Sequence, residues 1–490
     1  MGCFLCRRSV IYTGIQKIWV DIVSGMCYYF VEESVKFFLK TIEMGAGSSM
    51  MQSWFKQAKL GIFIHWGLYS VEGVHESWAM PFAKMSCEEY YKQKDHFTAE
   101  YYDPKEWAEY FKEAGANYVV LTTKHHEGFC LFDTEYTDLN VVKATPCGKD
   151  LVGPYVDALR EQGIKVGLYF TNTDWADDDH MRVILDLSQE ELDAMKKVKT
   201  HFFNQLLEDK QLPDPEKKEE LDACWARFMT RYKGEIKELM TRYMPDILWT
   251  DGMLTRTGFS WECKEVKQMI EQINPVTIVN GRLGDQGDYV TPECYIPLRP
   301  LEGEWELCIT MNSSWGYQPV DRSFKNVKRL VRIFVECISK GGNLLLSFGP
   351  DGKGRIQEEV INSLKEMGQW THKYAEAIYP TGAGLDPAFF LGGTTLSQDK
   401  QTLYLFAYDC STGQLMFNGI RNNIKKITSM VNGQELTYRI DGGSPGNGVP
   451  GFCWIDVPAD AVDDVCTVIK VELEGPIDIV DINANPEKMG

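Results

Sequence analysis

The chain has 490 residues and a mass of 56.0 kDa, which is too much for one ordinary core and predicts a large domain with at least one companion. Its formal net charge of -19 and pI near 5.0 would repel a phosphate backbone or an anionic membrane surface, so we exclude nucleic acid as a partner. The 44% of hydrophobic and 25% of charged residues lie in the range of globular domains, which excludes a disordered chain.

Residues 1–50 show no targeting signal. Charges at Lys17, Asp21 and Glu32 interrupt the apolar stretches, so no run reaches the roughly 20 residues of a membrane span, and no secretory leader with a cleavage site is present. The fourteen cysteines are scattered in a way that predicts neither a disulfide framework nor a zinc site. We therefore expect residues 1–50 to be an extension outside the fold, and favour a cytoplasmic over a secreted location.

From Lys59 onward, short apolar runs alternate with amphipathic helical stretches, the pattern of βα units that build a parallel sheet. Eight runs over roughly three hundred residues predict an α/β fold, a (β/α)8-like barrel within residues 51–378, with an open doubly wound sheet as the alternative. The runs are Leu60–Trp66, Tyr118–Thr123, Val166–Thr171, Ile247–Thr250, Val276–Asn280, a weaker one near Tyr289–Thr291, Leu307–Met311 and Leu344–Phe348.

Two further regions differ from this βα pattern. The charged helical region near 175–245 is longer than an ordinary βα connection, and we expect it to be an insertion in the barrel. After Tyr379-Pro380, short strands alternate with Gly, Asn and Asp turns, which predicts an antiparallel β-sandwich over residues 379–490.

Polar residues directly follow five of the apolar runs, and the carboxyl ends of barrel strands are where catalytic residues gather. We then expect one mouth of the barrel to contain His65, His125-His126, Asp251 and Arg282. Asn172 and its neighbours follow the third run in the same way. Each alone is weak evidence, since a strand-terminal Asp is equally the N-cap of the next helix. Together they suit the orientation of a hydroxyl-rich ligand, and thirteen tryptophans and twenty-three tyrosines suit packing on the C–H faces of a sugar.

Two other classes of protein remain as alternatives. One is a non-catalytic carbohydrate-binding pseudoenzyme that kept the pocket. The other is a metal-dependent barrel hydrolase; it is disfavoured because His125-His126 has no metal-ligand spacing, and adjacent strand residues point to opposite faces unless the strand has already ended.

A series of motifs between Trp54 and Trp370 closely resembles the α-L-fucosidases of glycoside hydrolase family 29. Several such motifs in family order are far more specific than any one of them. They are Gly61-Ile62-Phe63-Ile64-His65-Trp66-Gly67, Lys124-His125-His126-Glu127-Gly128-Phe129, Leu248-Trp249-Thr250-Asp251-Gly252, Thr291-Pro292-Glu293, Ser314-Trp315-Gly316-Tyr317 and the segment Gly341-Gly342-Asn343 through Asp351-Gly352.

The resemblance implies a barrel followed by a β-sandwich, and a retaining double displacement without a cofactor or metal. It implies that Asp251 is the nucleophile and forms a covalent fucosyl-enzyme. The acid/base carboxylate varies in position within the family; Glu293 is our choice, with Glu306 and Glu76 as alternatives.

The same resemblance implies a fucose pocket and a fucosylated oligosaccharide or glycoconjugate as the substrate. The sequence departs from the family pattern at Ser77, where many members have an acidic residue, and at Ser347, where Asn is common. Linkage preference depends on loops that the resemblance does not cover. The implied pocket residues are His65, His125, His126, Tyr169, Trp249 and Arg282, with Trp78 and Trp315 as apolar walls.

Overall fold

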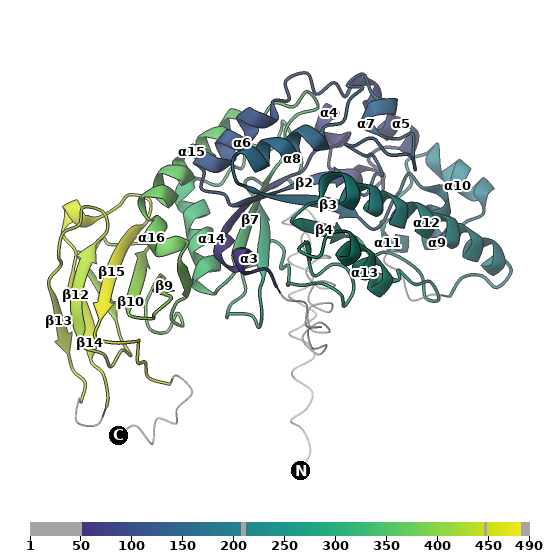
Figure 1. The fold of residues 1–490 in the computed structure, drawn as a ribbon. Helices are drawn as coiled ribbons and strands as arrows, with labels where there is room; N and C mark the ends of the chain where they lie inside the picture. Colours follow the sequence, from purple (N-terminus) through teal and green to yellow (C-terminus); the bar gives the residue numbers. More distant parts are fainter. Residues whose placement is uncertain (1–50, 207–211, 445–447, 482–490) are drawn as a thin grey trace, which may run out of the picture. The chain divides into compact units, whose positions relative to one another are not determined.

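The computed structural model describes residues 51–206, 212–444 and 448–481 (Figure 1). The chain divides after Ser49, and Met50–Gly490 is one compact unit. The extension expected at residues 1–50 lies outside the described residues.

Seven strands form one sheet in the order β5-β4-β3-β2-β1-β7-β6, and every neighbouring pair is parallel. Strands β1 to β5 lie side by side in sequence order, as in a barrel and unlike a doubly wound sheet, so the predicted fold class is confirmed. The strands are β1 (Leu60–Ile64), β2 (Tyr118–Lys124), β3 (Lys165–Thr171), β4 (Ile247–Asp251), β5 (Ile278–Val279), β6 (Glu306–Thr310) and β7 (Asn343–Phe348).

The eighth run, near Tyr289–Thr291, forms isolated parallel bridges rather than a strand. Tyr289 pairs with Asn280, and Val290 pairs with Trp305. Glu293 continues the same segment through a bridge to Cys308 on β6. The segment thus lies in the gap between β5 and β6 and carries Glu293 towards the carboxyl end of β6.

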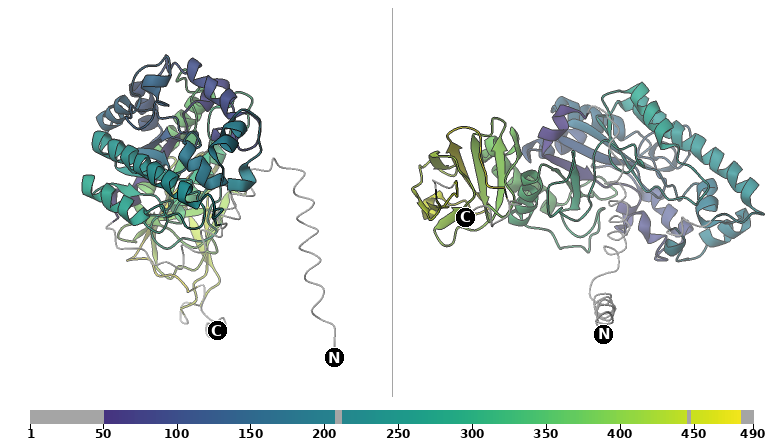
Figure 2. Two further views of the ribbon diagram at one scale, coloured as in Figure 1. Left: turned by 90° about the vertical axis from the view of Figure 1, so that its right-hand side faces the viewer. Right: turned by 90° about the horizontal axis from the view of Figure 1, so that it is seen from below.

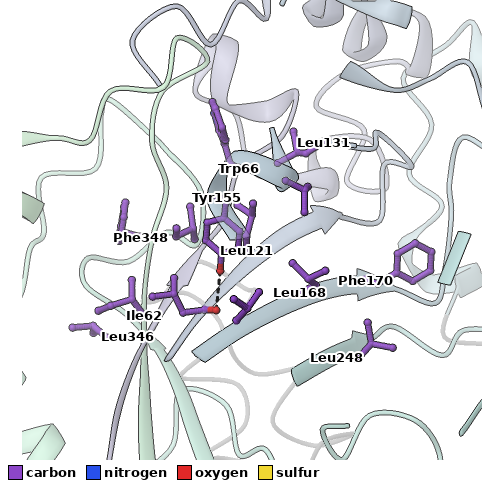
Figure 3. Close-up of a cluster of buried hydrophobic side chains, with 14 of the residues drawn as sticks. Ile62, Trp66, Leu121, Leu131, Tyr155, Leu168, Phe170, Leu248, Leu346 and Phe348 are labelled. Carbon is purple, nitrogen blue, oxygen red and sulfur yellow. Dashed lines mark hydrogen bonds between the residues drawn. The ribbon is translucent and has the colours of Figure 1, made fainter. Parts of the chain in front are cut away.

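Alternate residues of each strand belong to two different cores, as the period of two demands. The outer core lies between the strands and the helices. It contains one residue from each of five strands, all shown in Figure 3: Ile62, Leu121, Leu168, Leu248 and Leu346. The inner core fills the barrel with the residues between them. Its members include Phe63, Tyr118, Val120, Tyr169, Ile247, Trp249, Cys308 and Leu345.

Helix α8 contacts β3 and α14 contacts β7, while α6 packs on α8 and α15 packs on α6 and α14 (Figure 1). Helix α9 packs on the long helix α12 of the predicted insertion, whose teal ribbon Figure 2 shows from two sides. Helix α6 begins with Asp103 capping it and Pro104 at its first position, both strong start signals. The α-helices are α3 (Ser53–Ala58), α4 (Tyr69–Glu72), α5 (Cys87–Tyr91), α6 (Pro104–Glu113), α7 (Val141–Ala144), α8 (Val152–Glu161), α9 (Asp178–Leu185), α10 (Gln189–Lys196), α11 (Phe203–Leu206), α12 (Lys218–Tyr243), α13 (Cys263–Ile273), α14 (Val327–Ser339), α15 (Glu358–Lys373) and α16 (Ala375–Ile378).

The C-terminal part consists of two antiparallel sheets, which confirms the predicted sandwich architecture. A five-stranded sheet has the order β12-β15-β10-β9-β8, and a three-stranded sheet has the order β11-β14-β13. We propose that the boundary with the barrel lies near residue 379, just before β8. The strands are β8 (Thr381–Ala383), β9 (Gly393–Ser397), β10 (Thr402–Ala407), β11 (Gln414–Phe417), β12 (Ile424–Ser429), β13 (Tyr438–Asp441), β14 (Phe452–Asp456) and β15 (Thr467–Leu473).

Within the described ranges, none of the helices is both long enough and apolar enough to cross a bilayer.

Candidate active site

The strand period places the candidate residues inside the barrel. Phe63 of β1 and Trp249 of β4 belong to the inner core, so residues two positions further on, His65 and Asp251, continue the same face at the carboxyl ends of their strands. Tyr169 of β3 also points inward, stacks on Trp249 with ring centroids 5.5 Å apart, and donates a hydrogen bond of 3.1 Å to Asp251 Oδ2.

Arg282 joins the two candidate carboxylates. Its Nη1 donates to Asp251 Oδ1 at 2.8 Å and its Nη2 donates to Glu293 Oε2 at 2.5 Å, so one guanidinium spans both groups. The guanidinium carbon lies 4.6 Å from the centre of the Trp249 ring, a cation–π contact that holds the fork in place. Both carboxylates keep 20% side-chain exposure and are accessible to a ligand.

The charge of Arg282 also sets the ionisation of Asp251. Burial raises the pKa of this carboxyl, but the Arg282 charge and the neighbouring His126 outweigh burial and lower it to about 2. Asp251 is therefore ionised at any ordinary pH, as a carboxylate nucleophile must be.

Three histidines surround Asp251, and each ring contacts a hydroxyl through Nδ1. The partners are Ser347 for His65 at 2.9 Å, Ser77 for His125 at 2.6 Å and Thr171 for His126 at 2.7 Å. Burial lowers the pKa of His65 to about 3 and that of His126 well below its usual value, so both rings are neutral. Neutral imidazoles at this position offer hydrogen bonds to a ligand without adding charge.

His125 and His126 both face the site because β2 has already ended at Lys124. The ring of His125 stacks on Tyr169, with centroids 5.4 Å apart, while His126 Nε2 lies 3.8 Å from Asp251 Oδ2. Gly252 permits this approach, since it has φ +70° and a Cβ there would lie 2.7 Å from the His126 ring. In the described part of the chain, no group of three or more His, Cys, Asp or Glu side chains is arranged to hold a metal ion.

Two tryptophans supply apolar surface near the histidines. Trp78 contacts His126 edge to face, with centroids 5.6 Å apart, and Trp175 at 5.1 Å. Trp315 lies beside His65 at 5.1 Å. All ten predicted site residues therefore belong to one connected group around Asp251.

The alternative carboxylates lie in different surroundings. Glu306 is the first residue of β6 and so lies at the amino end of its strand, whereas the histidines follow the carboxyl ends of β1 and β2. Its side chain is fully buried. It accepts hydrogen bonds from Tyr118 Oη at 2.6 Å and Trp249 Nε1 at 2.9 Å, and burial raises its pKa to about 7. Glu306 thus holds the edge of the Trp249 ring, on whose face Arg282 lies.

Glu76 is also buried, with 1% exposure, and accepts a hydrogen bond from the Gly316 amide at 2.7 Å. Burial raises the pKa of this carboxyl, but contacts with His75 and the Gly316 amide outweigh burial and lower it to about 2. A carboxyl with so low a pKa is a poor general acid at neutral pH.

Several supporting residues were not predicted from the sequence. Thr171 orients His126, Glu127 contacts Ser77, and the Asn172 amide donates to the Asp251 carbonyl at 2.6 Å. The strand-end position of Thr171 and Asn172 was the only signal available, because the partner of a side-chain hydrogen bond depends on which strands become neighbours.

A parallel barrel that presents two arginine-bridged carboxylates among neutral histidines and tryptophans defines a class, the barrel glycoside hydrolases. A family model described as alpha-L-fucosidase matches residues 36–376. The chain belongs to the α-L-fucosidase family, glycoside hydrolase family 29.

Relatives and solved structures agree with this assignment. Human plasma alpha-L-fucosidase is 30% identical over 360 residues, which cover 68% of this chain and 70% of the relative. The alpha-L-fucosidase of Branchiostoma floridae is 30% identical over 363 residues, covering 68% and 73%.

Among solved structures, alpha-L-fucosidase isoenzyme 1 from Paenibacillus thiaminolyticus has a TM-score of 0.73 and 32% identity, covering 86% of this chain and 98% of that one. A Bacteroides thetaiotaomicron family member, trapped as a covalent intermediate with 2-fluoro-fucosyl fluoride, has a TM-score of 0.72 and 25% identity, covering 88% and 99%.

Proposed function

We propose that the protein hydrolyses terminal α-L-fucosyl linkages with retention, with Asp251 as the nucleophile and Glu293 as the acid/base. The observation that carries this proposal is the Arg282 guanidinium, which binds Asp251 and Glu293 at once. Retaining glycosidases need two carboxyl groups about 5–5.5 Å apart, and a single arginine fork favours such a short separation.

In the first step, Asp251 Oδ attacks the anomeric carbon while Glu293 gives its proton to the departing glycosidic oxygen. The C–O bond to the leaving group breaks and a fucosyl-aspartate ester forms. In the second step, Glu293 takes a proton from water, which attacks the same carbon and releases Asp251. Tyr169 and Arg282 hold the nucleophile in one orientation throughout, which lowers the entropic cost of attack.

Recognition of the sugar rests on the groups around the nucleophile. We assign His65, His125 and His126 to the ring hydroxyls, because hydroxyl side chains hold their Nδ1 atoms and their rings lie beside the nucleophile. Trp78 and Trp315 are assigned to the apolar face and the C6 methyl. Filling an apolar niche with one methyl is worth only about 1–3 kcal/mol, so hydroxyl stereochemistry must supply the remaining selectivity. The natural substrates would be the fucosylated ends of oligosaccharides or glycoconjugates.

The test is hydrolysis of 4-nitrophenyl α-L-fucoside by the wild type and by Asp251→Ala, Glu293→Ala, Glu306→Ala and Glu76→Ala. Glu302→Ala, an exposed glutamate of the same segment as Glu306, is the matched control. We expect Asp251→Ala to be inactive, and azide to restore Glu293→Ala alone by forming α-L-fucosyl azide, since azide needs no general base.

Rescue of Glu306→Ala or Glu76→Ala, with Glu293→Ala unimpaired, would move the acid/base role to that residue. A folded wild type that binds fucose but releases no nitrophenol would support the binding-protein alternative instead.

A further inference from the structure

Ser77 lies between His125 and Glu127 in a buried chain of short contacts. Its Oγ is 2.6 Å from His125 Nδ1, 2.5 Å from Glu127 Oε2 and 3.0 Å from the Glu127 amide nitrogen. Ser77 and Glu127 are fully buried and His125 is 6% exposed. No role for Ser77 or Glu127 follows from the double displacement itself.

The donors present determine the direction of each hydrogen bond among Ser77, His125 and Glu127. A carboxylate has no proton to donate, so the single hydroxyl proton of Ser77 goes to Glu127 Oε2. The lone pairs of Ser77 Oγ then accept from the Glu127 amide and from His125 Nδ1–H. This pattern favours a proton on His125 Nδ1, directed at Ser77, and leaves Nε2 to face the ligand.

His125 Nε2 is available to a ligand. In the described ranges, His125 Nε2 makes no hydrogen bond. Since it is also not one of the fully buried polar atoms without a partner, it keeps some exposed surface and borders open space. The ring that carries it stacks on Tyr169, the residue that donates to Asp251. His125 Nε2 therefore lies where it can bind a group next to the nucleophile, which on a sugar is a hydroxyl.

His126 provides an internal comparison. Its Nδ1 contacts the Thr171 hydroxyl, which donates at 2.7 Å to the carbonyl of Thr173. This arrangement fixes the same tautomer through a neutral acceptor. The series of hydrogen bonds from His125 through Ser77 ends instead on the Glu127 carboxylate. The carboxylate makes these hydrogen bonds charge-assisted and polarises the imidazole, so that Nε2 is a stronger acceptor.

Glu127 is a costly residue to bury for packing alone. Its second oxygen, Oε1, has no hydrogen-bond partner among the described residues, and burying a carboxylate without full pairing is expensive. Gly67 provides the space, since a Cβ there would lie 2.6 Å from Oε1. A buried carboxyl with one unpaired oxygen and one oxygen on Ser77 therefore points to a functional role.

We propose that Ser77 and Glu127 are positioning residues that fix the tautomer of His125 and strengthen its hydrogen bond to one particular hydroxyl of the substrate. This inference rests on the proposed fucosidase activity. In this chain the hydroxyl of Ser77 stands beside Trp78, and the carboxylate acts from behind it through His125 rather than touching the sugar. Ser77 and Glu127 together are thus specificity determinants for hydroxyl stereochemistry.

The test combines variants with substrates that lack single hydroxyls. kcat/KM is measured for the wild type, Ser77→Ala and Glu127→Gln on 4-nitrophenyl α-L-fucoside and on its 2-, 3- and 4-deoxy analogues. Ser70→Ala is the matched control, because Ser70 is equally buried but its hydroxyl has no hydrogen-bond partner in the described part of the chain.

We expect Ser77→Ala and Glu127→Gln to lose about 10- to 100-fold on the parent substrate, the range of one charge-assisted hydrogen bond. On the one deoxy analogue that lacks the hydroxyl bound by His125, the loss should fall below about 3-fold, because the partner is already missing. Ser70→Ala should retain the wild-type rate on all four substrates.

A second readout is spectroscopic. In the wild type with 15N-labelled histidine, the His125 signals should be those of the Nδ1–H tautomer, and Ser77→Ala should give a mixture with Nε2–H. Equal losses on all four substrates, or an unchanged tautomer in Ser77→Ala, would overturn the proposal. A wild type inactive on every fucoside would instead remove the proposed function, and the two failures are thus distinguishable.

Discussion

Replacing Arg282 with methionine should separate its electrostatic role from its packing. The methionine side chain still covers the Trp249 ring, while the charge shared by Asp251 and Glu293 is lost. Asp251 then lacks the cation that lowers its pKa, so that pKa should rise.

The size of the effect follows from the site. Arg282 is the largest of the influences that lower the pKa of Asp251 to about 2 from its ordinary value of 3.8, and burial acts against it. Without Arg282, the largest influence opposing burial is lost and the pKa of Asp251 should rise. Truncating one partner of a buried, hydrogen-bonded charge pair costs about 2–5 kcal/mol, so kcat/KM near neutral pH should fall by roughly 30-fold to several thousand-fold.

The assay is the pH dependence of kcat/KM for 4-nitrophenyl α-L-fucoside, quenched in base before absorbance is read. Because a depressed pKa keeps Asp251 ionised until the pH falls through about 2, the acidic limb that it contributes should move upward in Arg282→Met. Arg231→Met is the control, since Arg231 pairs with Asp177 and Asp179 outside the site. A folded Arg282→Met enzyme with the wild-type acidic limb would refute the reasoning.

Three further outcomes are expected. Glu306→Gln should make the free energy of unfolding less dependent on pH. The Glu306 carboxyl has a folded pKa of about 7, so it contributes stability below its unfolded pKa of about 4.5, and this stability is lost as the pH rises through 7. Urea unfolding of the variant and the wild type at pH 5 and pH 8 measures the difference. Gly61→Ala should lower the free energy of unfolding by about 1–3 kcal/mol in a thermal melt, since its Cβ would lie 2.3 Å from the Tyr118 ring; an unchanged melt would contradict that packing. Dialysis against EDTA should leave the fucosidase rate unchanged, and a loss restored by added metal would favour the metal-dependent alternative.

Much of the barrel was predictable because its strands are continuous apolar runs bounded by polar residues. The run Ile247–Thr250 became β4 with Asp251 as its last residue, and the sequence placed that residue at the correct end. The segment Tyr289–Thr291 was harder, since it pairs only through isolated bridges and has no continuous ladder. Its irregular backbone nevertheless carries Glu293.

The sequence motifs favoured Glu293 but left Glu306 and Glu76 as alternatives. Glu306 stands immediately before the run Leu307–Met311, so it lies at the amino end of β6, and its hydrogen bonds to Tyr118 and Trp249 became visible only in three dimensions. The contact between Ser77 and Glu127 was equally invisible, because 50 residues separate them and neither apolar periodicity nor motif spacing specifies a side-chain partner.

The most direct test of the account is the site of covalent attachment. Glu293→Gln enzyme is incubated with 2-deoxy-2-fluoro-α-L-fucosyl fluoride, digested with pepsin at low pH, and the labelled peptide is sequenced by mass spectrometry. The account predicts one fluorofucosyl group per chain, attached to Asp251. Attachment to Glu76 or Glu306, or turnover that never passes through a labelled protein, would contradict it.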